Sequence, residues 1–590
     1  GGSESGEFIL YWMRTAVRTD HNPALVTALE LAQRHQKPLL VYHAISERYP
    51  YASARHHTFI MEGAKDIAKK FQALHIPYAF HVEREGHRGP HLETLAKRSI
   101  AVVTEDMPVP FLAHWTEALA ERTLKNVYLV DTDCIVPMKL SKKAPTRAFQ
   151  FRDRFKAERE HRLHNTTFPP LSSFEISLAE ISLPFEPVDL DHVSFGDILK
   201  DCAIDHSVLP VPHTKGGADA AQERWAHYKK TKLHRYHKER NNPLMPHSVS
   251  RMSAYLHYGM ISSFQLATES LGYGAGGEKY RDELLIWREL AHHWCFHTAV
   301  PQHWMSLPQW ARETLEQHQN DPREYTVDWQ TLRHATTEDA LWNACQTSLN
   351  LHGELHNNLR MTWGKQLLTW FDNPRKALRM TLDLNNRFAL DGRDPSSYGG
   401  ILWCFGLFDR PFTPPQNVWG TVRERTCEHH ASRLNVDKYT QQITLSPFKQ
   451  LSIRSNLSPF VTCLLQQTLA LYNVELQYTG QDCLILPTDF GSSHQSKLII
   501  ASWIDADWLN KANETLTWTN TGNKHWQDLW STIPQIDTDQ ATSSLRINNN
   551  SLELKTTCPI DQFQQAMGWI VTQLHPSTNT MVKPQQIQLW

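Results

Sequence analysis

The sequence has no long hydrophobic run and no paired cysteines. A membrane helix needs roughly 20 consecutive apolar residues, and the most apolar windows here, such as residues 497–504, are only strand-sized. The nine cysteines are scattered, and none forms a Cys-x-x-Cys pair. A disulfide framework or a cysteine zinc site is therefore not indicated. We expect a cytoplasmic protein, a monomer, with no membrane segment and no metal.

An excess of charge of one sign is also missing. Lysine and arginine total 60 and aspartate and glutamate 62, which gives a net charge of -2 with histidine neutral. This balance does not point to nucleic acid, although the total cannot exclude a local basic groove. No Gly-x-Gly-x-x-Gly follows the first apolar segment, so a dinucleotide site of the usual Rossmann type is not supported.

Tryptophan, by contrast, is abundant. Of the 20 tryptophans, ten fall between residues 281 and 420 and seven lie after residue 500. This clustering asks for a functional explanation in the first group. In the second group, a hydrophobic core is the leading interpretation.

The chain divides into four segments by pattern. Residues 7–135 alternate strand-like runs with helical periodicity, which predicts a Rossmann-like parallel sheet covered by helices. The expected strands are 8–12, 38–42, 78–82, 101–104 and 126–130. Residues 136–215 are rich in proline and polar residues, and we interpret them as a long interdomain connector.

The remaining segments differ in character. Residues 216–445 show helix-length periodicity, notably at 282–298, 338–350, 354–371 and 374–388, which predicts an all-α domain. The glycine-rich run 272–277 has no preceding strand or phosphate-binding lysine and is expected to form a loop. Residues 446–590 show a helical pattern at 459–472, strand-like alternation at 474–478, 484–487, 497–503, 515–518 and 551–555, and a final helical pattern at 559–574. This order indicates a small α+β domain.

Two short motifs in the helical segment suggest binding chemistry. Hydroxyls and backbone N–H groups in Ser250-Arg251-Met252-Ser253 can hold a diphosphate at the start of a helix, although a plain helix cap explains them equally well. Glu283 and Trp287, four residues apart, share a helix face and could bind a base by hydrogen bonding and stacking. A core tryptophan beside a solvated glutamate is the simpler explanation of that pair taken alone.

The third motif is the tryptophan-rich stretch from residue 355 to residue 403. It contains Arg360, Asn385-Asn386, Asp391 and Trp403. Trp363 and Trp370 are seven residues apart, which places them on one helix face two turns apart.

In sequence order, these motifs resemble the photolyase/cryptochrome superfamily, and most closely the class II photolyases that repair cyclobutane pyrimidine dimers. The resemblance covers roughly residues 8–440. The matching segments are Tyr11-Trp12-Met13, Asp131 to Pro137, Arg288-Glu289-Leu290, Leu341 to Ala344, Leu359-Arg360-Met361 and Leu390 to Pro395.

The resemblance implies a bound FAD in the helical segment. Its diphosphate would lie on Ser250, Arg251, Met252 and Ser253, with Tyr236 and Asn386 nearby. Arg360 and Asp391 match the ion pair beside the isoalloxazine, where a fixed cation stabilises reduced, anionic flavin. Asn385 matches the class II asparagine that faces flavin N5. An antenna chromophore in the N-terminal segment is also compatible with the family, but the residues do not identify it.

The resemblance also assigns roles to five tryptophans. Trp342, Trp363 and Trp370 match a three-tryptophan electron path from the surface to the flavin, with Trp363 expected nearest the flavin. Trp287 and Trp403 would clamp the two faces of a dimer flipped out of UV-damaged DNA, while Glu283 hydrogen-bonds a thymine edge.

Two departures from the class II pattern keep a second function open. Ser396-Ser397 replaces the usual Asn-Gly after Asp-Pro. Residues 406–420 depart more strongly from the family pattern, which places there a tryptophan and a basic run that help to fill the gap left by a flipped dimer. A blue-light receptor that signals to a protein partner through residues 446–590 is the alternative. A descendant that has lost its flavin is disfavoured by Arg360, Asn385 and Asp391.

Overall fold

The computed structural model describes residues 5–444, apart from 176, 194, 212–213 and 324, together with seven short strands between residues 477 and 555. The chain forms two compact units. The first comprises residues up to 208 with 214–439, and the second comprises residues 209–213 with 440–590. Each unit is described separately below.

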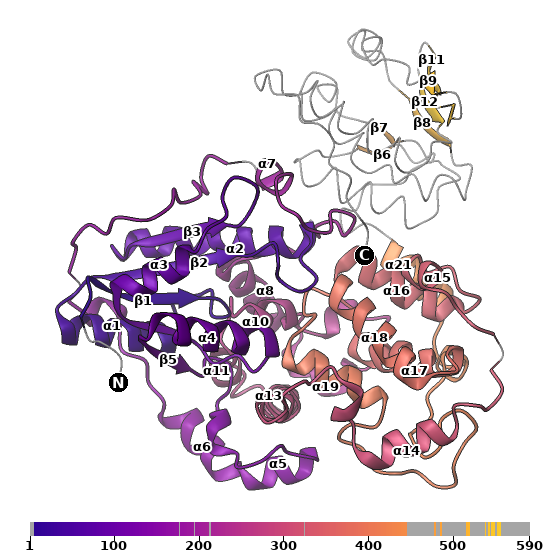
Figure 1. Ribbon diagram of the computed structural model, residues 1–590. Coiled ribbons are helices and arrows are strands. Elements are labelled where there is room, and N and C mark those ends of the chain that lie inside the picture. The colour runs from indigo at the N-terminus through magenta and orange to yellow at the C-terminus, as the bar shows by residue number, and fades with distance from the viewer. Residues whose placement is uncertain are drawn as a thin grey trace. The chain divides into compact units, whose positions relative to one another are not determined.

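The first unit begins with a parallel five-stranded sheet (Figure 1). Its strand order is β3-β2-β1-β4-β5, so the chain moves outward from β1 and then returns to the other side of it. The strands are β1 Phe8–Met13, β2 Leu39–Ile45, β3 Tyr78–Val82, β4 Ser99–Glu105 and β5 Asn126–Val130. All five predicted strands are confirmed, with ends that differ by up to three residues.

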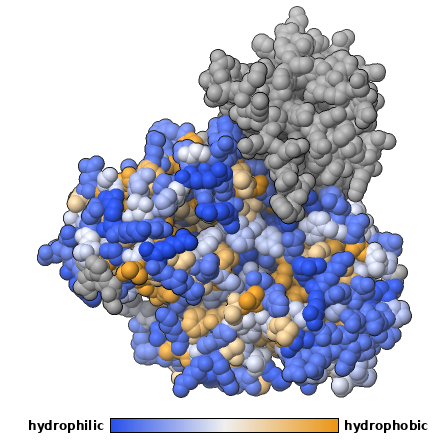
Figure 2. All heavy atoms as spheres, in the orientation of Figure 1, coloured by the Kyte–Doolittle hydropathy of each residue, from blue (hydrophilic) through white to orange (hydrophobic). Residues whose placement is uncertain are grey.

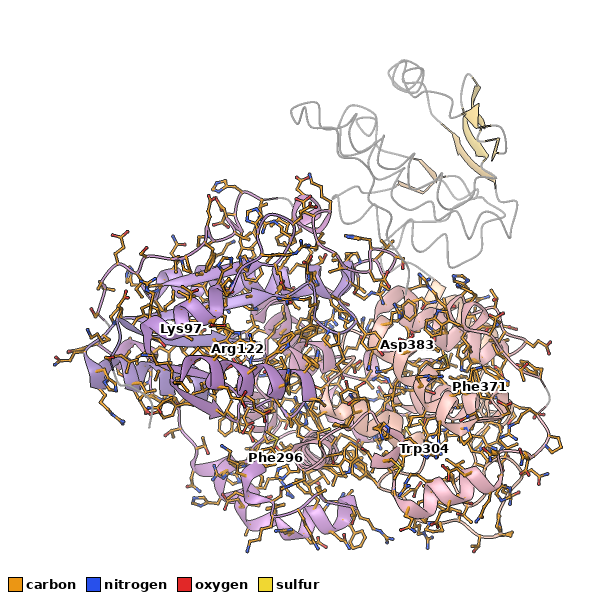
Figure 3. All side chains as sticks on the ribbon, in the orientation of Figure 1. Lys97, Arg122, Phe296, Trp304, Phe371 and Asp383 are labelled. Atoms are coloured by element: carbon orange, nitrogen blue, oxygen red, sulfur yellow. The ribbon has the colours of Figure 1, made fainter. Side chains whose placement is uncertain are left out.

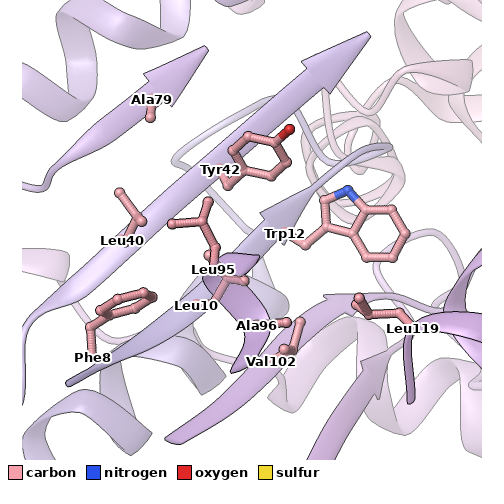
Figure 4. Packing of buried hydrophobic residues seen from close by; sticks show 10 residues of the cluster. All are labelled: Phe8, Leu10, Trp12, Leu40, Tyr42, Ala79, Leu95, Ala96, Val102 and Leu119. Atoms are coloured by element: carbon pink, nitrogen blue, oxygen red, sulfur yellow. The ribbon is translucent and has the colours of Figure 1, made fainter. Parts of the chain in front are cut away.

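Four helices cover the two faces of this sheet. They are α1 Pro23–His35, α2 Ala54–Ala73, α3 His91–Arg98 and α4 Pro110–Thr123. Figure 4 shows one face, where Phe8, Leu10 and Trp12 of β1 pack with Leu95 of α3 and Leu119 of α4. On the other face, residues of α2 pack with β2 and β3. The alternation of side chains along each strand separates these two cores.

The connector is more structured than its composition suggests. It contains the helices α5 Ala148–Arg154, α6 Lys156–Asn165 and α7 Phe195–Leu199, with short 3-10 turns at Met138–Leu140 and Leu171–Ser173. Ile181, Leu183 and Phe185 pack on the sheet core shown in Figure 4. The periodic patterns were too short to reveal these helices, because each helix covers at most about three turns.

Residues beyond the connector form the predicted helical region (Figure 1). Its longer helices are α8 Ala218–Thr231, α12 Gly274–Asp282, α13 Glu289–Phe296, α14 Gln309–Gln317, α16 Ala340–His352, α17 Asn357–Trp370, α18 Pro374–Phe388, α19 Pro395–Cys404 and α21 Val436–Thr444. Shorter elements are η3 Leu233–Arg235, α9 Tyr236–Glu239, η4 Pro246–Ser248, α10 Ser253–His257, α11 Ser263–Glu269, the π-helix η5 Glu283–Arg288, η6 Trp304–Ser306, α15 Trp329–Arg333 and α20 Cys427–Ala431.

The glycine-rich run corrects one expectation, because α12 begins inside it at Gly274. The glycines serve close packing. A Cβ on Gly276 would lie 2.1 Å from the Leu233 carbonyl oxygen, and one on Gly277 would lie 2.2 Å from the Ser270 carbonyl oxygen. The run therefore lets α12 approach neighbouring backbone closely and does not form the expected loop.

Four of the strands described in the second unit lie where alternation predicted them, and the three between residues 537 and 548 were not predicted. The strands are β6 Gln477–Tyr478, β7 Leu484–Ile485, β8 Thr515–Thr519, β9 Asp537–Thr538, β10 Ala541–Thr542, β11 Ser544–Asn548 and β12 Ser551–Lys555. β11, β12 and β8 form an antiparallel sheet. The predicted helices at 459–472 and 559–574, and the predicted strand at 497–503, lie outside the described residues. No helix among the described residues is long and apolar enough to cross a membrane.

Candidate functional site

An ion pair links α17 to the loop after α18. The Arg360 guanidinium donates from Nη1 to Asp391 Oδ2 at 3.1 Å and from Nη2 to Asp391 Oδ1 at 3.0 Å. Two parallel hydrogen bonds of this kind fix the orientation of both groups. Both side chains are mostly buried, at 13% and 15% exposure, so the pair places a guanidinium of fixed direction inside the helical region.

Glycine brings Asp391 close to the end of α18. A Cβ on Gly392 would lie 2.8 Å from Asn386 Cα and 3.0 Å from the Asn385 carbonyl oxygen. Only glycine therefore lets the loop fold back on α18 this closely. As a result, the predicted residues Arg360, Asp391, Asn385 and Asn386 meet in one place.

The Asn385 side chain leaves its carbonyl oxygen without a partner. Its Nδ2 donates to Ser397 Oγ at 2.7 Å and to Asn386 Oδ1 at 3.2 Å. Asn386 Oδ1 also accepts the backbone N–H of Arg393 at 3.1 Å. Because that N–H can only donate, it fixes which end of the Asn386 amide faces it, and this in turn fixes Asn385. Asn385 Oδ1 is fully buried and unpaired, which marks a position for a hydrogen-bond donor from outside the chain.

The segment from Ser248 to Ser253 shows similar open groups. Ser250 Oγ lies 3.2 Å from the Tyr280 hydroxyl, and the Tyr236 ring meets the Tyr280 ring edge-on at 5.3 Å. Ser248 Oγ and Arg251 Nε are buried without a hydrogen-bond partner, although the Arg251 guanidinium forms an ion pair with Glu354. No side chain caps the start of α10. Some of the backbone and side-chain groups in this segment therefore form no hydrogen bond within the protein and could bind a diphosphate.

The three tryptophans of the predicted electron path lie in contact, and their order can be read from the geometry. The rings of Trp363 and Trp342 are stacked at 6.2 Å between centroids, and those of Trp342 and Trp370 meet at 5.2 Å. Trp363 and Trp370 are about 10.5 Å apart along α17 at 1.5 Å per residue. Trp342 of α16 bridges them, which gives the order Trp363, Trp342, Trp370.

Two further tryptophans form a stacked pair. The rings of Trp287 on η5 and Trp403 on α19 lie 4.7 Å apart between centroids and are nearly parallel, at 13°. Both are half-buried. A base cannot enter between rings that already touch, so the pair forms a wall and not the clamp expected from the sequence. Trp287 packs beside the core of Val136, Phe151, Ile286 and Leu290, which holds its ring in place.

Glu283 lies at the start of the same π-helix. Its carboxylate is bound by Arg240 Nη1 at 3.0 Å and Lys279 Nζ at 2.8 Å. The Glu283 carboxylate is therefore ion-paired, whereas the simpler explanation assumed that it is only solvated. The four-residue spacing of Lys279 and Glu283 is compatible with such a pair on one helix face, whereas Arg240 comes from a distant segment that no local pattern connects with Glu283.

A buried charge network ties the wall to the Asp391 loop. Arg288 follows Trp287 and donates to Asp133 Oδ1 at 3.0 Å, with Asp394 Oδ2 at 3.9 Å. His257 Nδ1 lies 3.4 Å from Asp394 Oδ2. Burial works against ionisation of Asp394, but the hydrogen bond with His257 and the charge of Arg288 hold its pKa well below the usual value. The charged pair anchors two elements that carry site residues.

The departing segment 406–420 is firmly attached to the helical region. The Val418 N–H donates to Asp321 Oδ2 at 2.8 Å, and buried Lys365 donates to the carbonyls of Cys404 and Arg423 at 2.9 Å each. Burial lowers the pKa of Lys365 to about 8. The Phe412 ring of this segment contacts two guanidinium groups, those of Arg410 at 5.6 Å and of Arg423, which follows the segment, at 5.7 Å. An aromatic ring in contact with two cations thus occupies the altered segment.

The surface shown in Figure 2 agrees with this placement. Hydrophobic residues gather in the middle of the visible face, in the region of α13 and α19. Hydrophilic residues dominate the periphery of the same face. An apolar centre with a polar rim is typical of a binding surface. Among the described residues, no three His, Cys, Asp or Glu side chains come together in a way that could hold a metal ion.

Sequence reasoning missed Ser397 as a partner of Asn385. The departure at Ser396-Ser397 was visible, but only the fold shows the two residues using their hydroxyls differently. Ser396 Oγ donates to Asp394 Oδ1 at the start of α19, whereas Ser397 Oγ accepts from Asn385.

The sheet, the helical region and the clustered side chains together define a photolyase/cryptochrome fold. Residues 9–172 match the family model described as DNA photolyase. The chain is 30% identical over 440 residues to a deoxyribodipyrimidine photo-lyase of Methanothermobacter thermautotrophicus, covering 74% of this chain and 95% of that protein. It is 27% identical over 447 residues to an Arabidopsis thaliana deoxyribodipyrimidine photo-lyase, covering 74% and 88%.

Solved structures show the same fold. A class III photolyase from Agrobacterium tumefaciens superposes with a TM-score of 0.56 at 16% identity, covering 75% of this chain and 87% of that one. A cryptochrome from Synechocystis gives a TM-score of 0.53 at 15% identity, covering 75% and 93%. The chain belongs to the DNA photolyase family within the photolyase/cryptochrome superfamily.

Proposed function

We propose that this protein repairs cyclobutane pyrimidine dimers in UV-damaged DNA by light-driven electron transfer from reduced FAD, in the manner of class II photolyases. The observation that carries the proposal is the contact series Trp363, Trp342 and Trp370, which begins one helical turn after Arg360. Indole is among the most readily oxidised side chains, and rings in contact allow short electron hops. Relatives named deoxyribodipyrimidine photo-lyase support the choice of substrate.

The residues present fit a flavin in the helical region. Unpaired, buried Asn385 Oδ1 offers an acceptor for a ring N–H, and the unpaired groups at Ser248 and Arg251 offer donors to a phosphate. The isoalloxazine would lie beside Arg360, with the diphosphate at residues 250–253 and Tyr236 and Asn386 nearby. When bound, reduced FAD supplies a light-excited electron to the dimer and takes it back after the ring has opened. An antenna chromophore would lie in residues 7–135.

The chain's own residues would tune this chemistry. The Arg360 guanidinium stabilises negative charge on the adjacent ring, and the Asp391 carboxylate offsets the cost of burying that cation. Asn385 Oδ1 would accept a hydrogen bond from an N5–H group of the flavin, whereas it would repel the lone pair of an unprotonated N5. It therefore favours a ring that is protonated at N5. Both effects act in the same direction, because they stabilise the reduced cofactor over the oxidised one.

The damaged bases would lie against the stacked Trp287–Trp403 wall. Flipping a dimer out of the duplex costs less than flipping normal bases, because a dimer stacks poorly. Glu283 would hydrogen-bond a thymine edge, and its neighbours Arg240 and Lys279 place positive charge nearby. Phe412, in contact with Arg410 and Arg423, would fill the gap in the duplex and contact phosphates in place of the family's tryptophan and basic run.

Repair of a defined dimer under blue light tests the proposal. The purified protein with its flavin fully reduced is mixed with single- and double-stranded DNA carrying one thymine dimer, and intact thymines are measured by chromatography. Restoration in the light but not in the dark is expected. A Glu283→Gln, Trp287→Ala double variant that still binds flavin serves as the control for background photochemistry. Absence of repair on both substrates would contradict the proposal.

The second compact unit favours one alternative function. Residues 440–590 form most of a separate unit, so a blue-light receptor could pass a flavin-driven change to a protein partner through them. We divide the chain into residues 7–135 for the antenna-type domain, 136–215 for the connector, 216–445 for the flavin domain and 446–590 for the extension. Flavin photoreduction without dimer repair would select the receptor.

A further inference from the structure

The tryptophan series ends inside the protein. Trp363 and Trp342 are completely buried, and Trp370, the distal member, has only 2% of its surface exposed. The path from the surface that the resemblance implied is therefore incomplete. An oxidised Trp370 ring has almost no surface at which a reductant dissolved in water could deliver an electron. Without another donor, the electron would return from the flavin to the oxidised ring.

Tyr325 lies next to Trp370 at this end of the series. The two ring centroids are 5.6 Å apart and the planes are tilted by 37°. This spacing falls between the 5.2 and 6.2 Å that separate the tryptophans themselves. Unlike the three indoles, Tyr325 is only half-buried. It is therefore the member of the contact series that reaches solvent.

The segment that carries Tyr325 is fixed to the end of α17. Arg323 Nε donates to the carbonyl of Phe371, the residue that follows Trp370, at 3.2 Å; Phe371 is labelled in Figure 3. Arg323 Nη1 also donates to the His318 carbonyl at 3.3 Å. These bonds anchor the backbone two residues before Tyr325. The hydrogen bond between Arg323 and Phe371 thus joins the segment that carries Tyr325 to the residue next to Trp370.

We propose that Tyr325 is the terminal electron donor of the series Trp363, Trp342, Trp370, Tyr325. This inference rests on the proposed flavin photoreduction. One electron passes from the Tyr325 phenol to the oxidised Trp370 ring, the O–H bond breaks, and its proton goes to water. The products are a neutral tyrosyl radical and restored Trp370. Loss of the proton makes return of the electron slow, and an external thiol reductant then reduces the radical from the solvent side of the half-buried ring.

A tyrosine-to-phenylalanine substitution tests this role. Tyr325→Phe keeps the ring but removes the oxidisable O–H, and transient absorption after a blue-light flash follows the radicals. In the unmodified protein, the tryptophan radical signal should decay into a tyrosyl radical signal. In Tyr325→Phe the tyrosyl signal should vanish, and steady photoreduction by a thiol should slow several-fold. Tyr325→Trp should restore an exposed, oxidisable ring and recover most of the rate.

Tyr273→Phe is the matched control. Tyr273 is also half-buried, but it lies at the start of α12 and is not part of the contact series. This variant should leave both signals unchanged. Thermal unfolding of all three variants checks that each is folded. An unchanged tyrosyl signal in a folded Tyr325→Phe protein would overturn the inference while leaving the proposed function intact. A protein that binds no flavin would overturn both.

Discussion

Two completely or almost completely buried asparagines, one in the sheet region and one in the helical region, behave differently. Asn22, at the start of α1, donates from Nδ2 to the Tyr11 hydroxyl and to two backbone carbonyls, and its Oδ1 accepts the Leu25 N–H. Asn385 uses both hydrogens of its amide but leaves its oxygen unpaired. Burial without a partner costs free energy. The first asparagine stabilises the fold, and the second keeps a binding group available.

Charged side chains in the two regions differ in the same way as the two asparagines. In the sheet region, Glu105 is buried and both oxygens are used, by the Tyr11 hydroxyl at 2.7 Å and the Arg14 N–H at 3.0 Å. In the helical region, the Arg360–Asp391 pair keeps part of its surface exposed. Asn22 and Glu105 are thus satisfied by partners within the sheet region, whereas Asn385 and the Arg360–Asp391 pair keep part of their binding capacity open.

A break in the tryptophan series separates electron transfer from folding. Trp363→Phe should slow flavin photoreduction about tenfold or more, equivalent to at least about 1.4 kcal/mol in the barrier, because it breaks the series at its first member. Flavin should remain bound. Trp304→Phe is the control, since Trp304 is also buried but lies outside the series; it is labelled in Figure 3. Equal rates in the two variants would remove Trp363 from the path.

Truncating each asparagine tests the contrast directly. Asn22→Ala should lower the free energy of unfolding by about 3 kcal/mol, because it removes a helix cap and strands several buried partners. Asn385→Ala should cost about 1 kcal/mol or less in the flavin-free protein, because it also removes an unpaired oxygen. Denaturant titration of both proteins measures the difference. Equal losses would mean that Asn385 is a structural residue like Asn22.

Acid should weaken the sheet region through His43. Burial lowers the pKa of His43 to about 3, below its unfolded value of about 6.5. The unfolded chain then binds the proton more readily, so the contribution of His43 is complete above about pH 6.5 and is lost as the pH falls towards 3. At pH 5 the loss is about 2 kcal/mol relative to pH 7. In His43→Gln, the fall in unfolding free energy between pH 7 and pH 5 should be smaller by that amount. An unchanged fall would show that His43 is not buried in its neutral form.

The Phe412 ring tests whether the altered segment contacts DNA. Phe412→Ala should weaken binding to duplex DNA carrying a dimer by about 1–2 kcal/mol, the usual cost of losing one base–aromatic contact. Binding to a single strand should change less, because no gap in a duplex needs filling there. Fluorescence anisotropy with both substrates measures the two affinities. Parallel losses on both substrates would argue against the gap-filling role.

The smallest expected effect concerns the orientation of Asn385. Ser397→Ala should lower the midpoint potential of bound flavin by about 20 mV, the equivalent of about 1 kcal/mol for a two-electron couple. The reason is that the Asn385 amide loses one of the bonds that direct its oxygen. Ser396→Ala, whose hydroxyl binds Asp394 instead, should leave the potential unchanged, and Ser397→Thr should restore it. A potential that responds equally to both alanine variants would exclude orientation by Ser397.

The sequence alone determined the fold class and the elements that carry the site. Short apolar runs between helical segments located all five strands of the sheet, and helical periodicity located the helices that became α16, α17 and α18. Patterns of this kind can be recognised from the sequence because they need few tertiary contacts. The short helices of the connector and the helical start at Gly274 escaped this reasoning, since packing and not local periodicity decides them.

Spacing along the chain placed Trp363 and Trp370 on one helix face, and only the tertiary structure inserted Trp342 between them and Tyr325 at the end. The stacked wall of Trp287 and Trp403 and the turn of the Asn385 amide were likewise decided by contacts between distant segments. Residue type fixes what a side chain can do. Its direction and its neighbours depend on packing between elements, which no local pattern contains.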